Sequence, residues 1–254
     1  MRLQAQMPIK LRNKLLGGKK PLICIPIISE DETHLVDEVN KVIKMKPDAI
    51  EWRVDYFESI KDFSKVNHIL KIIRIKTDDI PIILTCRSHE EGGYKNIDDE
   101  VKLKLFEGAI KSGYVDAIDI ELAFGKEKIE HIKSLATKKG VKLILSYHNF
   151  VETPSEEFMM RKIKEEITYG ADIPKIAVMP KEQGDVLKLL SVTYNARKKI
   201  SNPLITVSMG SLGFISRFVG CIFGSDMTFA SGVNESAPGQ MPIEEMRRFI
   251  EIII

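Results

Sequence analysis

The residue of this chain that is best suited to catalytic chemistry is Lys175, in the apolar segment PKIAVMP at 174–180. Along a strand, Ile176 and Val178 share one face and Lys175 takes the other, inner face. A buried lysine must pair with a carboxylate, lose its proton or do covalent work. Desolvation or a neighbouring cation makes an amine neutral and nucleophilic, as imine chemistry requires. An ion pair with Glu51 is the structural alternative.

A second candidate for chemistry is His148, which ends another apolar run. Three other histidines, His34, His68 and His131, fall within helical patterns, where a surface or capping role is the default, and His89 lies on a loop. A histidine at the end of a strand is well placed for proton transfer. We therefore expect His148 to act as a general acid or base.

Charged side chains follow two further apolar runs. In the segment EWRVD, Glu51 and Arg53 alternate with apolar residues, so both charges would point away from the helices and need partners. A structural ion pair is the alternative to a ligand site. After the next run come Arg87 and, on a Gly-containing loop, Glu91, a pattern that suits a polyol or carboxylate as well as a solvated loop.

The C-terminal part of the chain carries an anion-binding pattern. A Gly-rich turn at 208–217 ends in Arg217, and its backbone donors and cation suit an anion. The segment at 231–240 combines small residues with Pro-Gly, as a mobile lid would. On these residues alone, a phosphosugar aldolase is a fair alternative.

These side chains must be positioned by an alternation of apolar runs and amphipathic helical segments. Runs with several consecutive apolar residues indicate strands that are covered on both faces. Gly113, Gly140 and Gly170 stand where helix ends require a left-handed residue, and Ser29 with Glu32 forms a capping-box pattern. The predicted strands are 22–28, 49–57, 81–87, 115–122, 141–148, 174–179, 204–209 and 226–230.

Eight strand–helix units in 254 residues predict a single-domain (β/α)8 TIM barrel that spans residues 1–254. A doubly wound open sheet is the alternative, but the first turn after a strand has no GxGxxG pattern. We expect residues 1–20 to form a short N-terminal extension that closes the bottom of the barrel. In such a barrel, functional residues gather at the carboxyl ends of the strands.

Composition excludes several classes of protein. Hydrophobic residues make up 44% and charged residues 29%, and 38 basic against 36 acidic side chains leave a net charge of +2, with no basic arm or acidic tail. Nothing therefore indicates a nucleic acid or a membrane as partner, and we expect no signal peptide. The three cysteines, Cys24, Cys86 and Cys221, form no CxxC pair and are expected to be reduced core thiols of a cytoplasmic protein.

Six segments in order resemble the type I 3-dehydroquinate dehydratases, enzymes of the shikimate pathway. Any one would be a weak match, but six in sequence are specific, and they cover nearly the whole chain. They are EWRVD (51–55), TCRS…EGG (85–93), SYHNF (146–150), PKIAVMP (174–180), SMGSLGFISR (208–217) and SAPGQ (236–240).

The resemblance implies three catalytic residues: Lys175 as the imine-forming lysine, His148 as general acid and base, and Glu91 orienting His148. It also implies that Glu51, Arg53 and Arg87 hold the ring hydroxyls of the substrate, that Arg217, Ser236 and Gln240 grip its carboxylate, and that Phe229 lines the pocket. Two positions depart from the pattern, because Pro26 replaces a hydroxyl residue and Val207 replaces a bulkier methionine.

The activity that the resemblance implies is conversion of 3-dehydroquinate to 3-dehydroshikimate and water by syn elimination through a Schiff base. It further implies a homodimer, and neither a metal nor an organic cofactor, because the lysine supplies the electron sink. Two alternatives use the same barrel. One is a class I aldolase-type lyase that cleaves a carbon–carbon bond, and the other is a non-catalytic carboxylate-binding barrel.

Overall fold

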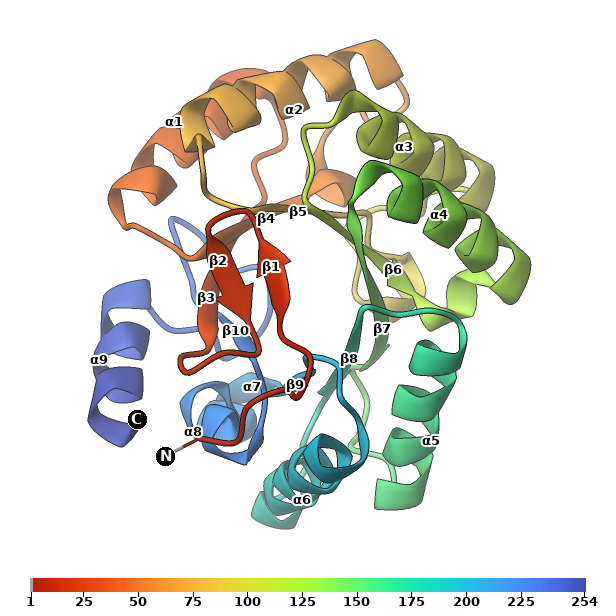
Figure 1. Ribbon diagram of the computed structural model, residues 1–254. Helices are drawn as coiled ribbons and strands as arrows, with labels where there is room; N and C mark the ends of the chain where they lie inside the picture. Colours follow the sequence, from red (N-terminus) through yellow and green to blue (C-terminus); the bar gives the residue numbers. More distant parts are fainter. Residues whose placement is uncertain (1) are drawn as a thin grey trace.

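A computed structural model describes residues 2–254, and its centre is a barrel of eight parallel strands (Figure 1). The hydrogen-bonded order is β10-β3-β4-β5-β6-β7-β8-β9, so the predicted (β/α)8 barrel is confirmed. The strands are β3 (Leu22–Ile27), β4 (Ala49–Arg53), β5 (Ile82–Thr85), β6 (Ala117–Glu121), β7 (Lys142–Asn149), β8 (Ile173–Val178), β9 (Ile205–Ser208) and β10 (Met227–Phe229).

Helices surround the barrel and alternate with its strands. They are α1 (Glu32–Lys44), α2 (Phe63–Thr77), α3 (Asp99–Ser112), α4 (Lys126–Lys139), α5 (Glu156–Thr168), α6 (Gln183–Lys199), α7 (Gly210–Gly213), α8 (Ser216–Phe223) and α9 (Ile243–Ile253). Short 3-10 turns are η1 (Val54–Tyr56), η2 (His89–Glu91) and η3 (Leu122–Phe124). Between residues 2 and 254, no helix combines the length and the apolarity that crossing a membrane demands.

The residues that cap the helices agree only in part with those predicted from the sequence. Gly113 and Gly140 have positive φ angles of 73° and 74° and cap α3 and α4, as predicted. The predicted capping box was wrong, because Asp31, directly before Glu32, accepts the backbone N–H of His34 and caps α1. Ser29 instead donates its hydroxyl to Glu38.

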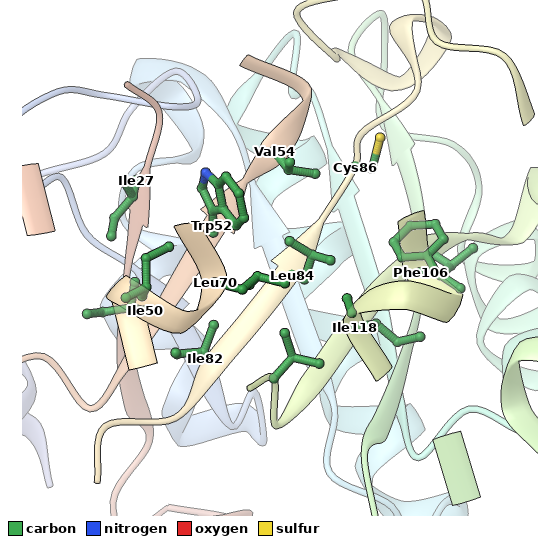
Figure 2. Packing of buried hydrophobic residues seen from close by; sticks show 14 of the residues in the cluster. Ile27, Ile50, Trp52, Val54, Leu70, Ile82, Leu84, Cys86, Phe106 and Ile118 are labelled. Carbon is green, nitrogen blue, oxygen red and sulfur yellow. The ribbon is translucent and has the colours of Figure 1, made fainter. Parts of the chain in front are cut away.

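Alternation along the strands divides the side chains between two cores. Trp52 and Val54 point outward into the layer between barrel and helices, as predicted, and Figure 2 shows Trp52 above Leu70 of α2. Ile176 likewise packs outward against α5 and α6, whereas Lys175 faces the barrel interior. Full burial of one such aliphatic side chain contributes about 1.5–3 kcal/mol. The outer layer therefore fixes which side chains point inward.

An antiparallel hairpin, β1 (Ile9–Leu11) and β2 (Lys14–Leu16), lies across one end of the barrel (Figure 1). Its Leu11 and Leu16 are buried and pack with inward-facing residues near the amino ends of the strands, among them Leu22, Ile144 and Ile205. This end of the barrel is therefore filled by apolar side chains, and polar side chains that face inward gather at the opposite, carboxyl end.

Asp226 joins the one seam of the barrel that has no strand ladder within residues 2–254, between β9 and β10. Its buried carboxylate accepts the backbone N–H of Leu204 at 2.8 Å and pairs with Arg2 and Arg197. The backbone N–H of Asp226 also donates to the carbonyl of Leu204 at 2.7 Å. One carboxylate thus connects the N-terminus, α6 and both strands of the seam.

We expect the substitution Asp226→Ala to lower the free energy of unfolding by about 3–5 kcal/mol, because it leaves two buried guanidinium groups without their shared partner. Urea denaturation would measure this loss. The control Asp37→Ala removes an exposed carboxylate of α1 and should change stability by no more than about 0.5 kcal/mol. Equal stability of the two variants would contradict the role of Asp226.

Candidate active site

A cavity opens at the carboxyl ends of the strands, and all ten predicted site residues line it. The predicted residues come from β4, β7, β8 and β10 and from the segments that follow β5, β9 and β10. The lining residues are Glu51, Arg53, Arg87, Glu91, Gly92, His148, Phe150, Lys175, Ala177, Val207, Met209, Arg217, Phe229, Ser236, Ala237 and Gln240.

Lys175 extends from β8 into this cavity and is only 5% exposed. Its Nζ donates to Asp119 Oδ2 at 2.7 Å and lies 3.8 Å from Glu51 Oε1. The ammonium also lies 4.5 Å from the centre of the Phe229 ring. The nearest carboxylate is therefore Asp119 rather than Glu51, which instead accepts the hydroxyl of Thr85 at 2.7 Å.

Asp119 belongs to a buried charge network centred on Arg87. The Arg87 guanidinium pairs with Asp119 at 2.9 Å and with Glu121 at 2.7 Å. Burial raises the pKa of Asp119, but the adjacent Arg87 and Lys175 outweigh it and hold that pKa well below its usual range. Burial lowers the pKa of Arg87, but Asp119 and Glu121 outweigh it and raise that pKa above its usual value. Arg87 and Asp119 are therefore both charged at neutral pH.

The sequence reasoning missed Asp119, Glu121 and Ser146 as parts of this site. Ser146 donates its hydroxyl to Asp119 at 2.6 Å and accepts from Arg87 at 2.9 Å. A signal for the two acids was present, because they stand at alternate positions of β6, AIDIE, and so share one face of a predicted strand. The apolar residues between them face the helices, which leaves only the barrel interior for the charges.

His148 of β7 and Glu91 of η2 form a second pair in the cavity wall. His148 Nδ1 lies 2.9 Å from Glu91 Oε2, and the same oxygen accepts the backbone N–H of His148 at 2.9 Å. Burial, together with the positive charges of Arg87 and Lys175, lowers the pKa of His148 well below its ordinary value. Burial raises the pKa of Glu91 to about 8. Both members are therefore neutral near pH 7.

This pairing leaves one imidazole nitrogen for chemistry. With Nδ1 held by Glu91, His148 Nε2 has no hydrogen-bond partner among the described residues of the chain. In the tautomer with the proton on Nδ1, Nε2 is a free proton acceptor. A neutral histidine in a cavity beside a lysine is suited to repeated proton transfer.

Arg217 provides a cation that the protein itself does not neutralise. Within residues 2–254 no carboxylate lies within 4.0 Å of its guanidinium, which donates to the carbonyls of Phe229 at 3.3 Å and Pro238 at 2.7 Å. Its Nε is buried without a partner in the same range, and burial lowers the pKa of Arg217 to about 10. An anion entering the cavity would remove this imbalance.

The segment after β10 closes over Arg217. The backbone N–H of Ser236 donates to Gln240 Oε1 at 2.8 Å, and Gln240 Nε2 donates to the Ser236 hydroxyl at 3.2 Å. The carbonyl of Pro238 accepts from both Arg217 and the backbone N–H of Gly210. These contacts hold the predicted lid segment against the cavity.

The remaining predicted residues have structural partners of their own. Arg53 makes two hydrogen bonds to Asp55, at 2.9 and 2.8 Å, and its charge is thereby balanced. Val207 lines the cavity, whereas Pro26 pairs in register with Glu51 and is not among the lining residues.

Across residues 2–254, no three His, Cys, Asp or Glu side chains are grouped so that they could hold a metal ion.

Comparison with known proteins identifies the family. A family model described as type I 3-dehydroquinase matches residues 23–254. The chain belongs to this family. Membership makes it a hydro-lyase, and favours dehydration over the aldolase-type and non-catalytic alternatives.

Individual relatives of this type I 3-dehydroquinase cover nearly its whole length. It is 44% identical over 247 residues to the 3-dehydroquinate dehydratase of Geobacillus thermodenitrificans, which covers 97% of this chain and 96% of that protein. The crystal structure of the Geobacillus kaustophilus enzyme has 40% identity and a TM-score of 0.97, covering 100% of this chain and 98% of that one. The type I enzyme of Clostridium difficile, solved with covalently modified comenic acid, has 38% identity, a TM-score of 0.94 and 97% coverage of both chains.

The Glu91–His148 pair makes stability depend on pH in a defined direction. Glu91 keeps its proton in the folded state up to about pH 8, whereas the unfolded chain loses it near 4.5, so stability falls as pH rises through that window. His148 acts oppositely, but only below its unfolded pKa near 6.5. Between pH 6.5 and 8, the native protein should therefore lose up to about 2 kcal/mol relative to Glu91→Gln.

Urea denaturation of both proteins at pH 6.5 and pH 8.0 measures this difference. Other titrating groups are common to the two proteins and cancel in the comparison. Equal pH dependence would show that Glu91 is already ionised in the folded state at pH 6.5.

Proposed function

We propose that this type I 3-dehydroquinase converts 3-dehydroquinate to 3-dehydroshikimate and water through an imine on Lys175. The observation that carries the proposal is a buried amine that shares one cavity with a neutral histidine and an unbalanced arginine. The covalent modification in the related Clostridium difficile enzyme supports a covalent step.

The substrate is held by complementary charge. Its carboxylate pairs with Arg217, the cation that lacks a carboxylate partner among residues 2–254, and is gripped by the lid residues Ser236 and Gln240. This contact draws the lid toward the ligand, because Arg217 is already bonded to the carbonyl of Pro238. The ring hydroxyls are bound, and the ring is packed, by Glu51, Arg53, Arg87 and Phe229.

Imine formation begins when Lys175 Nζ gives a proton to His148 Nε2, which frees the lone pair of the amine to attack the ketone carbon. Asp119, 2.7 Å away, stabilises the charged form of the amine. When the amine attacks the substrate, a carbon–nitrogen bond replaces this contact. His148 delivers protons to the oxygen of the carbinolamine, which leaves as water. The product of these steps is a cationic imine in a cavity that already holds Asp119 and Glu51 to balance it.

Elimination follows because the cationic imine acts as an electron sink. His148 Nε2 removes a proton from the carbon next to the imine, and the electron pair forms an enamine. The enamine then returns its electrons, expels the hydroxyl at the β-carbon, and His148 gives its proton to that oxygen. One base that serves both steps removes hydrogen and hydroxyl from the same face of the ring. Hydrolysis of the imine releases 3-dehydroshikimate and frees Lys175.

Glu91 serves this cycle by holding the imidazole. Its contacts to both Nδ1 and the backbone N–H of His148 fix the position of the ring, so that Nε2 faces the cavity through both proton transfers. Glu91 Oε2 accepts the Nδ1 proton of the imidazolium that forms in mid-cycle, whereas burial returns His148 to its neutral form afterwards.

Trapping with borohydride tests the covalent step. Mass spectrometry with peptide mapping should find an adduct on the Lys175 peptide after incubation with 3-dehydroquinate and borohydride. Lys175→Ala should form no adduct and lose nearly all turnover, whereas Lys181→Ala, an exposed lysine nearby, should behave as wild type. His148→Ala should still form adduct but lose about 10²–10⁴-fold in turnover. A folded wild-type protein without adduct would overturn the imine mechanism.

We also propose a cytoplasmic homodimer. The three cysteines are free and buried, which suits a reducing compartment. On the surface, Phe249 of α9 stacks on Phe218 of α8, and Ile252 beside it is 72% exposed, so α8 and α9 present an apolar face suited to a second copy.

Light scattering after gel filtration should give about twice the chain mass of 28.8 kDa. Ile252→Glu should shift the protein toward the monomer, because it places a charge in the apolar face. The control Leu187→Glu changes an equally exposed apolar residue of α6 and should leave the dimer intact. A monomeric wild-type protein would contradict the proposal.

A further inference from the structure

We infer that Lys102 is a positioning residue for Arg87: from outside the barrel, its ammonium fixes the Glu121 carboxylate that holds the Arg87 guanidinium. This inference rests on the proposed function, in which Arg87 binds the substrate. Lys102 lies on α3 rather than on a strand, and it is not among the residues that line the cavity. Yet it is only 3% exposed, which is unusual for a lysine on an outer helix.

The contacts of Lys102 connect it to the site through two residues. Its Nζ donates to the Ser88 hydroxyl at 2.7 Å and lies 3.9 Å from Glu121 Oε2. Glu121 Oε2 makes no hydrogen bond within residues 2–254, so the lysine charge is its nearest compensation there. The other oxygen, Oε1, accepts from Arg87 Nη1 at 2.7 Å and from the Ser88 backbone at 3.0 Å. Lys102 and Arg87 thus hold opposite oxygens of one buried carboxylate.

The local charge balance makes this lysine necessary. Glu121 is 1% exposed and shares Arg87 with Asp119, which is also fully buried. Without Lys102, the three linked carboxylates Glu51, Asp119 and Glu121 have only two cations, Arg87 and Lys175, and Glu121 Oε2 loses the ammonium that faces it. The titratable or charged groups around Glu121 and Lys102 are Cys86 and Arg87 after β5, Glu90 and Glu91 of η2, Asp98 and Asp99 at the start of α3, and Asp119 of β6.

Loss of the ammonium that faces Glu121 Oε2 would leave this carboxylate free to shift, and so weaken its hold on Arg87 and on the Ser88 backbone. Both contacts fix the start of the loop that carries Glu91 as well as the guanidinium itself. Arg87 would keep Asp119 and Ser146 as partners, so the catalytic Lys175–Asp119 contact would survive. The loss should therefore fall mainly on substrate binding rather than on the chemical steps.

The test is the substitution Lys102→Met, which keeps the length of the side chain and removes its charge. We expect KM for 3-dehydroquinate to rise about 10-fold at pH 7.5 with a much smaller change in kcat. Lys102→Arg, which restores the charge, should return KM to near the wild-type value. Lys104→Met, on the exposed side of the same helix, should leave KM and kcat unchanged.

Calorimetric binding of 3-dehydroquinate in a Lys175→Ala background separates this inference from the proposed function. If the wild-type protein does not turn over 3-dehydroquinate, the proposed function fails. The inference is still tested, because the affinity of the Lys175→Ala protein can be compared with that of the Lys175→Ala, Lys102→Met double variant. An affinity unchanged by Lys102→Met would overturn the inference, as would a Lys102→Arg variant that binds as weakly as Lys102→Met. Circular dichroism and a melting curve for each variant exclude global unfolding as the cause.

Discussion

The site depends on one interaction, the guanidinium of Arg87 held between the buried carboxylates of Asp119 and Glu121. Charges can remain buried only when they are paired and hydrogen-bonded, and each of these groups supplies the partner that another requires. Asp119 in turn receives Lys175, so the position of the lysine ammonium follows from the position of the arginine. A side chain of the loop after β5 thereby organises residues of β6, β7 and β8.

The barrel supports this network by separating apolar and polar layers along its axis. At the amino end, the hairpin residues Leu11 and Leu16 seal an interior of aliphatic side chains. The outer face of the same strands is covered by helices through residues such as Trp52, as Figure 2 shows. With both apolar surfaces satisfied, the inward positions at the carboxyl ends can carry charges in a low dielectric, where electrostatic interactions are strong.

Two electrostatic regimes therefore coexist in one cavity. Arg87 and Asp119 are charged and hold each other in place, whereas the His148–Glu91 pair is neutral because burial outweighs the mutual attraction of their charged forms. Proton transfer requires a group that can change its charge, and His148 supplies it. Arg217 is a third case, a cation left for an anion that arrives with the substrate.

The sequence by itself determined the fold, and strand alternation assigned the side chains of the strands to the helix face or the interior. The family resemblance, not alternation, proposed Glu91, Arg217, Ser236 and Gln240, which lie outside the strands and line the same cavity. Parity alone placed Lys175 and Glu51 inward and Trp52 outward, and six ordered motifs resembled one family. The sequence did not determine which charges meet. It offered Glu51 as the partner of Lys175, whereas the closed barrel brings Asp119 of β6, on the far side of β7 from β8, to 2.7 Å from Lys175 Nζ. Likewise, only the packing of α3 against the barrel decided that Lys102, an ordinary helix residue in the sequence, lies buried beside Glu121.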